Sequence, residues 1–159
     1  MNPKQYLIFL IVLLVSCTQS PDSQTTRQAE VAERGREVMP FDLERTTHIF
    51  KPLPTGGLQQ VISDDDDHEQ IALIRTHLLK EVERFQAGDF HDPAMIHGNE
   101  MPGLHTLMTR ADEITMTYQE LPDGGEILYT SKDEAIIEAL HLWFEAQLSD
   151  HGHHATDGS

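Results

Sequence analysis

Apolar residues recur every three or four positions in two segments of the chain, 69–86 and 133–149, and this spacing predicts a helix in each. The first segment has a single apolar stripe, which consists of Ile71, Ile74, Leu78, Val82 and Phe85. The second is apolar around most of its circumference, through Ile136, Ile137, Leu140, Leu142, Trp143, Phe144 and Leu148. We therefore expect the second helix to be the more buried of the two, or to contact a second copy of the chain in a homodimer.

The same series of elements precedes each predicted helix: a strand, a Leu-Pro-x-Gly-Gly turn and a second strand. The two turns lie at 53–57 and 121–125. When the helices are aligned on their histidines, His77 with His141, the same shift pairs Glu81 with Glu145 and Gly88 with Gly152. The sequence therefore predicts an α+β domain built from two pseudo-symmetric ββα repeats, 46–88 and 114–152. We expect a four-stranded antiparallel sheet with two helices on one face.

The start of the chain, 1–17, has the pattern of a signal segment. Lys4 precedes the apolar run 6–15, which is too short to span a membrane but long enough for the centre of a signal peptide. The run ends in Leu14-Val15-Ser16-Cys17, which resembles the lipobox of bacterial lipoproteins. The resemblance implies lipidation of Cys17 in the cell envelope, and Thr18 after it implies the outer membrane, facing the periplasm. The alternative is an ordinary secretory signal with an incidental cysteine.

Polar segments flank the predicted domain on both sides. Residues 18–40 are poor in aliphatic side chains and are predicted to form a flexible tether. Residues 153–159 are predicted to be a disordered tail. Between them, 41–152 should fold as a single domain in which 89–113 is a long loop connecting the repeats.

The charge balance is strongly acidic, with 11 Lys and Arg against 27 Asp and Glu and a formal net charge of −16. Such a surface repels nucleic-acid phosphates and anionic lipids. We therefore expect no nucleic-acid partner, and contact with a membrane through the lipid anchor only. An acylated Cys17 would leave the mature chain without a thiol, so a metal site would have to use other side chains.

Two His-x-x-x-Glu pairs on the predicted helices are the leading candidates for metal ligands. His77 with Glu81, and His141 with Glu145, lie four residues apart and therefore on one helix face. Two such helices side by side could supply four ligands to zinc or iron. His48 is a further candidate, because alternation along its strand turns it towards the helices. The alternatives are weak surface pairs on the helices and a core histidine at His48.

The 89–113 loop carries a second candidate site. His97, Met101 and His105 recur at intervals of four, although Gly98 and Pro102 exclude a continuous helix through them. Imidazole and thioether ligands together suit copper or haem. The alternative is that Met101 fills a gap in the hydrophobic core.

Several short motifs give the chain a family resemblance. They are Thr47-His48, Gln70-Ile71-Ala72-Leu73-Ile74-Arg75, Gly88-Asp89-Phe90, His97-Gly98, Met101-Pro102-Gly103, Trp143-Phe144 and Asp150-His151-Gly152. In these the chain resembles a family of small uncharacterised bacterial proteins, some of which are labelled aspartate carbamoyltransferase. This sequence does not support that label, because the chain is too short for the two α/β domains of that enzyme and has no carbamoyl-phosphate loop.

Three classes of function follow from these features. The first is a cell-envelope lipoprotein that binds a transition metal (zinc, copper or iron) or haem through a His/Glu/Met cluster. The second is a metal-dependent enzyme that uses the same cluster, with Glu81 or Glu145 as general base beside a metal-bound water. The third is a structural or partner-binding lipoprotein without a small-molecule site.

Overall fold

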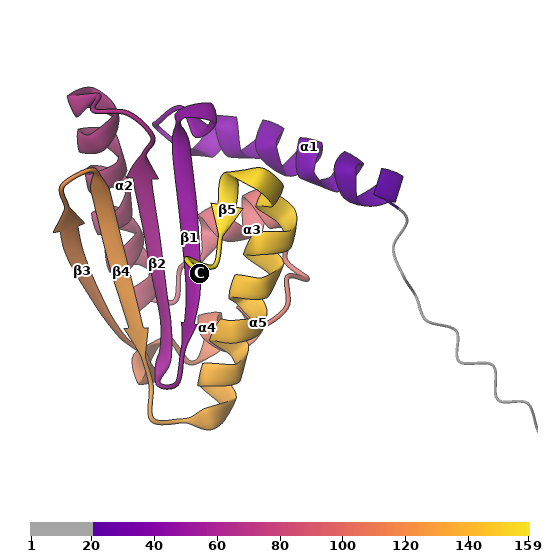
Figure 1. Ribbon diagram of the computed structural model, residues 1–159. Helices are drawn as coiled ribbons and strands as arrows, with labels where there is room; N and C mark the ends of the chain where they lie inside the picture. The colour runs from indigo at the N-terminus through magenta and orange to yellow at the C-terminus, as the bar shows by residue number, and fades with distance from the viewer. Residues whose placement is uncertain (1–20) are drawn as a thin grey trace, which may run out of the picture.

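The computed structural model describes residues 21–159, so the predicted signal segment and the lipidation site Cys17 lie outside the described part of the chain. That part is an α+β domain with five α-helices and one five-stranded sheet (Figure 1). In chain order the elements are α1 (Pro21–Val38), η1 (Leu43–Arg45), β1 (Thr46–Leu53), β2 (Gly56–Ser63), α2 (His68–Gln86), α3 (His91–His97), α4 (Leu104–Thr109), η2 (Ala111–Glu113), β3 (Thr115–Leu121), β4 (Gly124–Thr130), α5 (Glu134–His151), η3 (Gly152–His154) and β5 (Ala155–Thr156).

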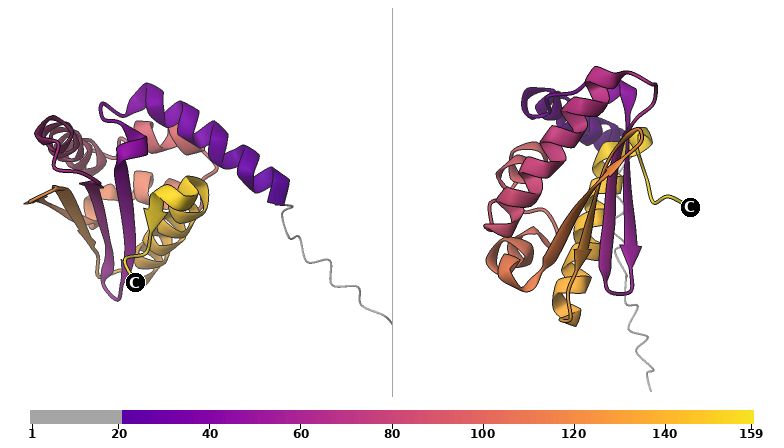
Figure 2. Two further views of the ribbon diagram at one scale, coloured as in Figure 1. Left: turned by 45° about the horizontal axis from the view of Figure 1, so that its top comes forward. Right: turned by 90° about the vertical axis from the view of Figure 1, so that its left-hand side faces the viewer.

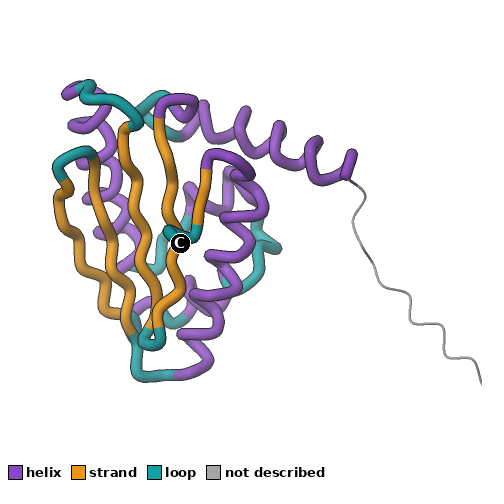
Figure 3. The backbone as a smooth tube through the Cα atoms, viewed as in Figure 1, coloured by secondary structure: helices purple, strands orange, loops and turns teal. Residues whose placement is uncertain are grey.

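The sheet has the strand order β3-β4-β2-β1-β5 (Figure 3). The hairpins β1–β2 and β3–β4 form at the two Gly-Gly turns and meet along β2 and β4, all antiparallel. The short strand β5 then pairs in parallel with β1, where Ala155 lies opposite His48. The prediction of a four-stranded antiparallel sheet is therefore wrong. Residues of the predicted disordered tail pair instead with the edge of β1, whose backbone groups would otherwise lack strand partners there.

Helices α2 and α5 pack on one face of the sheet, α2 across β3 and β4 and α5 across β1 and β2 (Figure 2). Each begins at an aspartate N-cap: Asp67 accepts from the backbone N–H of Glu69, and Asp133 from that of Ala135, both at 2.9 Å. Buried aromatic side chains fill the space between the helices and the sheet, among them Phe50, Phe85, Phe90, Tyr129, Trp143 and Phe144. α1 and α4 pack against α5, so the described residues hold more than the two helices that the repeats predict.

The two ββα units make matching contacts, but with a different helix alignment from the predicted one. His77 stands ten positions after its N-cap Asp67, whereas His141 stands only eight positions after its N-cap Asp133. Counting from these caps, the counterpart of His77 is Trp143 and the counterpart of His141 is Arg75. The predicted superposition of His77 on His141 is therefore wrong, because it followed matching letters instead of the helix starts. That the units arose as repeats stays a prediction.

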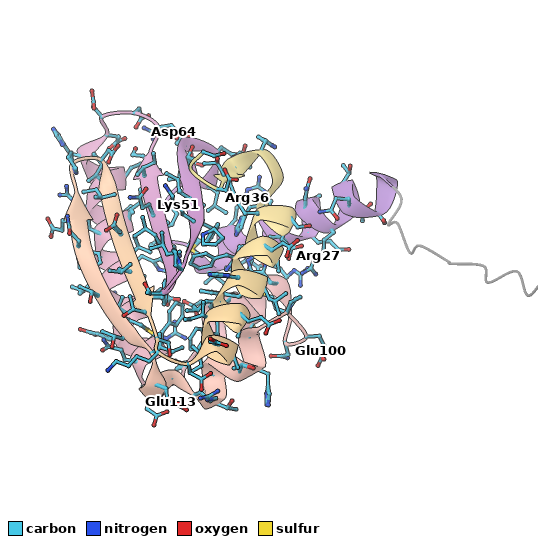
Figure 4. All side chains as sticks on the ribbon, turned by 60° about the horizontal axis from the view of Figure 1, so that its bottom comes forward. Arg27, Arg36, Lys51, Asp64, Glu100 and Glu113 are labelled. Atoms are coloured by element: carbon cyan, nitrogen blue, oxygen red, sulfur yellow. The ribbon has the colours of Figure 1, made fainter. Side chains whose placement is uncertain are left out.

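The segment predicted as a flexible tether is largely helical. α1 packs against α3 and α5, and its Val31 is buried. Figure 4 labels Arg27 on α1. Its guanidinium donates from Nε and Nη2 to the carboxylate of Asp150 at 3.0 and 2.6 Å, and from Nη2 to the carbonyl of His97 at 2.6 Å. These contacts fix a helix whose composition alone is typical of a linker. The predicted loop 89–113 likewise contains α3, α4 and η2. Across residues 21–159 no helix combines the length and apolarity that a membrane crossing needs.

Candidate metal centre

A small cavity of about 30 Å³ lies between the sheet, α2, α3 and α5. Its lining includes four imidazoles and one carboxyl group, contributed by His48 on β1, His77 and Glu81 on α2, His97 on α3 and His151 at the end of α5. His48, His77, Glu81 and His97 are buried. Ionisable side chains in an apolar interior are costly unless they are paired or bind an ion, so their convergence at one cavity indicates a site.

His77 and Glu81, which line this cavity, form a close group with Asp92, and we call the three residues the carboxylate site. Each offers one ligand atom, and these atoms all lie within 4.8 Å of one another. His77 and Glu81 are one turn apart on α2, and Asp92 stands in the first turn of α3. Among the described residues no other set of three or more His, Cys, Asp or Glu side chains meets this criterion.

Burial sets the protonation of the carboxylate site. Burial and, after it, the charge of Asp92 together raise the pKa of Glu81 to about 8, against the opposing charge of Arg84. Burial also lowers the pKa of His77 to about 4, so the imidazole is neutral at pH 7. The Arg84 guanidinium holds the two carboxyl groups, with Nη1 3.1 Å from Glu81 and 2.7 Å from Asp92. A divalent cation bound here would meet a neutral imidazole and two carboxyl groups, one of which must first lose its proton.

A second group of side chains lines the same cavity. The ring centroids of His48 and His151 are 4.9 Å apart, and those of His97 and His151 are 5.0 Å apart. Nδ1 of His97 lies 2.8 Å from Oδ2 of Asp150. Nε2 of His48 is buried and has no hydrogen-bond partner among the residues that the structure describes. We call His48, His97 and His151 the imidazole cluster.

The second predicted His-Glu pair does not contribute to the cavity. His141 turns its Nε2 to the carbonyls of Leu53 and Gly56, at 3.0 and 2.9 Å, and so holds the β1–β2 turn. Glu145 is exposed and borders an open groove. The expectation that both pairs would share one metal is therefore wrong, because α5 directs this pair to a hairpin turn and to the surface.

The predicted loop site is not assembled either. His97 points to Asp150, Met101 is packed in the hydrophobic core, and His105 is exposed on α4. A single copper or haem site through these three side chains does not exist in this arrangement. Met101 fills the core, as the alternative interpretation has it.

Sequence reasoning missed two members of the site. The sequence predicts Asp92 only as part of the long 89–113 loop, but α3 begins at His91, which places Asp92 in the first turn with its carboxyl group beside Glu81. The sequence places His151 at the end of the domain beside a disordered tail, but α5 continues through it. The Asp150-His151-Gly152 motif, one of the motifs in the family resemblance, is the sequence signal that points to His151.

Comparisons of the chain with protein-family models, with curated proteins and with solved structures find no match. The resemblance to the small bacterial family therefore stays a prediction, and the site is assigned from its geometry.

Proposed function

We propose that this protein is a cell-envelope lipoprotein that binds a transition metal ion through His77, Glu81 and Asp92. One observation carries the proposal: three ligand atoms from two helices lie within 4.8 Å of one another beside a buried cavity. The ring stack of Phe85 on Phe90, with centroids 4.3 Å apart, packs the end of α2 against the start of α3. The ligands therefore come from rigid elements instead of mobile loops.

The donor set favours zinc or ferrous iron. One imidazole and two carboxylates are ligands that these ions share, whereas copper sites of the thioether type would need the side chain of Met101, which is packed in the core. Haem does not fit, because a cavity of about 30 Å³ is far smaller than the several hundred Å³ of a typical cofactor pocket. The proposed ligand is therefore a single metal ion.

The same volume favours binding over catalysis. An enzyme needs space for a substrate beside the metal-bound water, and a cavity of about 30 Å³ holds little more than a water molecule. Glu81, the candidate general base, is also a candidate ligand and cannot serve in both roles at once. We therefore propose metal binding without catalysis as the function, and a metal-dependent enzyme as the second candidate.

The proposed lipid anchor would hold the domain close to the membrane. α1 begins at Pro21, so three residues separate it from Cys17. Three extended residues span about 10 Å. We expect Cys17→Ala to move the chain from the membrane fraction to the soluble fraction. Unchanged sedimentation with membranes would contradict lipidation at this residue.

Metal content tests the binding site directly. The full chain carrying Cys17→Ala is stripped with a chelator, loaded with zinc and measured by elemental analysis. Glu81→Gln combined with Asp92→Asn should bind one zinc fewer per chain than the parent. The matched control is Glu145→Gln, which changes the exposed glutamate of the other His-x-x-x-Glu pair and should leave the zinc content unchanged. An unchanged zinc content in the double variant would overturn the proposal.

A further inference from the structure

Arg84 bridges both carboxyl groups of the carboxylate site. Its Nη1 lies 2.7 Å from Asp92 on α3 and 3.1 Å from Glu81, three residues earlier on α2. Its Nε lies 2.8 Å from the carboxylate of Asp89, in the connection between the two helices. One guanidinium therefore contacts three carboxyl groups, and two of them belong to the proposed metal ligands.

The guanidinium contacts the same carboxyl oxygens that a metal ion would use. Zinc binds carboxylate oxygens at about 2.0–2.2 Å. An ion bound to the oxygen of Asp92 that accepts from Arg84 would therefore lie within about 5 Å of Nη1. Arginine stays charged in proteins, so the ion and the guanidinium would repel each other at this distance.

The charges at the site also oppose the simultaneous presence of a metal ion and Arg84. Glu81 and Asp92, once both are ionised, balance the charge of a divalent ion, and a ligating imidazole at His77 is neutral. The guanidinium would then be an additional positive charge beside side chains that are only 7% and 15% exposed. A charge without a partner is costly away from solvent.

Asp89 offers the guanidinium another partner. Its carboxylate accepts from Nε of Arg84 at 2.8 Å, and its side chain is 49% exposed. The side chain of Arg84 is itself 31% exposed, so the guanidinium can turn towards solvent while it stays paired with Asp89. The site therefore has a place for Arg84 when an ion takes the two ligands.

We infer that Arg84 is the resident cation of the carboxylate site, held by Glu81 and Asp92 in the metal-free protein and displaced towards Asp89 when zinc or ferrous iron binds. Because the ligands are the same three side chains, this role rests on the proposed function. Arg84 thus lowers the affinity of the site by competition. An arginine that only oriented the two carboxylates would raise the affinity, so the two roles predict opposite effects when its charge is removed.

Arg84→Gln removes the charge and keeps a side chain that forms hydrogen bonds. In the full chain carrying Cys17→Ala, we expect this substitution to tighten zinc binding by about 5- to 150-fold, the usual range of coupling between two bound ligands. Competition with a chromophoric chelator measures the dissociation constant, and the chain with Glu81→Gln and Asp92→Asn measures zinc bound elsewhere. An unchanged or weaker affinity in folded Arg84→Gln would overturn the inference.

Arg110 provides the matched control. It also bridges two carboxylates, those of Glu113 and Asp133, at 2.7 and 2.8 Å, and its side chain is 31% exposed like that of Arg84. Neither partner belongs to the carboxylate site, so Arg110→Gln should leave zinc affinity unchanged. If Arg110→Gln tightens zinc binding as much as Arg84→Gln does, the overall charge of the chain is responsible and the inference is wrong.

Asp89→Asn tests the displacement without changing a ligand. Loss of the second partner leaves Arg84 on the two ligands, so zinc should bind more weakly than in the parent. In the Arg84→Gln chain the same substitution should have little effect, because Asp89 acts on the ion through Arg84. An equal loss of affinity in both chains would show that Asp89 attracts the ion directly, and displacement towards it would be refuted.

Nitrogen NMR of the arginine side chains follows the displacement in a chain that keeps Arg84. Zinc should shift the Nε signal of Arg84 and leave that of Arg110 in place. An Arg84 signal that stays in place as zinc binds would overturn the inference, even if Arg84→Gln did not fold. The proposed function fails separately, when zinc content does not depend on Glu81 and Asp92. Where zinc content depends on both but the Arg84 results fail, the inference alone is wrong.

Discussion

Arg75 and His141 hold opposite hairpin turns through matching carbonyl groups. Arg75 on α2 donates to the carbonyls of Leu121 and Gly124 on either side of the β3–β4 turn, with Nε 3.1 Å from Gly124. His141 on α5 donates from Nε2 to the corresponding carbonyls of the β1–β2 turn, at 3.0 and 2.9 Å. Both side chains stand eight positions after the aspartate N-cap of their helix. Each helix thus fixes the turn of the hairpin that precedes the other helix.

This relationship gives His141 a role in stability and none in metal binding. We expect Arg75→Ala and His141→Ala each to lower the free energy of unfolding by about 1–2 kcal/mol, because turn carbonyls lose their donors. His141→Ala should keep the zinc content of the parent. Urea unfolding and elemental analysis measure the two quantities. Loss of zinc from a folded His141→Ala chain would contradict the assignment of His141 to the turn.

The hairpins and main helices could be predicted because they depend on local patterns. The Gly-Gly turns, the apolar periodicity of α2 and α5 and the aspartates before them are all readable over a few residues. The position of His77 against Asp92 depends instead on how α3 turns back onto α2, which no local pattern encodes. Likewise, α1 is polar, with Val31 as its buried apolar residue, and it is fixed by the pairing of Arg27 with Asp150, a residue near the other end of the chain.

Arg27 should therefore control whether α1 stays docked. Its guanidinium makes two hydrogen bonds to Asp150 and one to the carbonyl of His97. Arg27→Ala removes all three hydrogen bonds and leaves the partly buried Asp150 carboxylate without two of its donors. We therefore expect the free energy of unfolding to fall by about 2–3 kcal/mol. Limited proteolysis should then cleave within α1 faster than in the parent.

Arg36 provides the matched control on the same helix. It is half-exposed and pairs with Glu33 and Glu44, which are more exposed still. Exposed ion pairs contribute little, so Arg36→Ala should change stability by less than about 1 kcal/mol and leave the cleavage rate unchanged. Equal cleavage rates in Arg27→Ala and Arg36→Ala would show that α1 docks without the Arg27–Asp150 pair.

The stability of the metal-free chain should be greatest near pH 6.5. His48 and His77 have pKa values lowered to about 4 from an ordinary 6.5, so the folded state binds fewer protons than the unfolded state between these values. Their contribution is present above pH 6.5 and is lost as the pH falls towards 4. Glu81 acts in the opposite direction, because its pKa is raised to about 8 from 4.5 and the folded state keeps its proton.

The two effects separate above pH 6.5, where Glu81 alone is titrating among these three groups. The free energy of unfolding should fall there by up to about 1.4 kcal/mol per pH unit until about pH 8. Below pH 6.5 the two histidines outweigh Glu81, and stability should fall with acid. Thermal unfolding at a series of pH values, with a chelator present, measures how stability depends on pH. Glu81→Gln should remove the decline above pH 6.5, and a decline that persists in this variant would assign it to another group.

Zinc binding should release about one proton per chain at pH 7. Glu81 is protonated there because its pKa is raised to about 8, and a carboxyl group must lose its proton to bind the ion. His77 contributes almost no proton, since its pKa of about 4 leaves the imidazole neutral. Titration calorimetry in two buffers of different ionisation enthalpy counts the protons. The count should fall towards zero at pH 9, where Glu81 is already ionised. If zinc binds at pH 7 without releasing a proton, Glu81 is not a ligand.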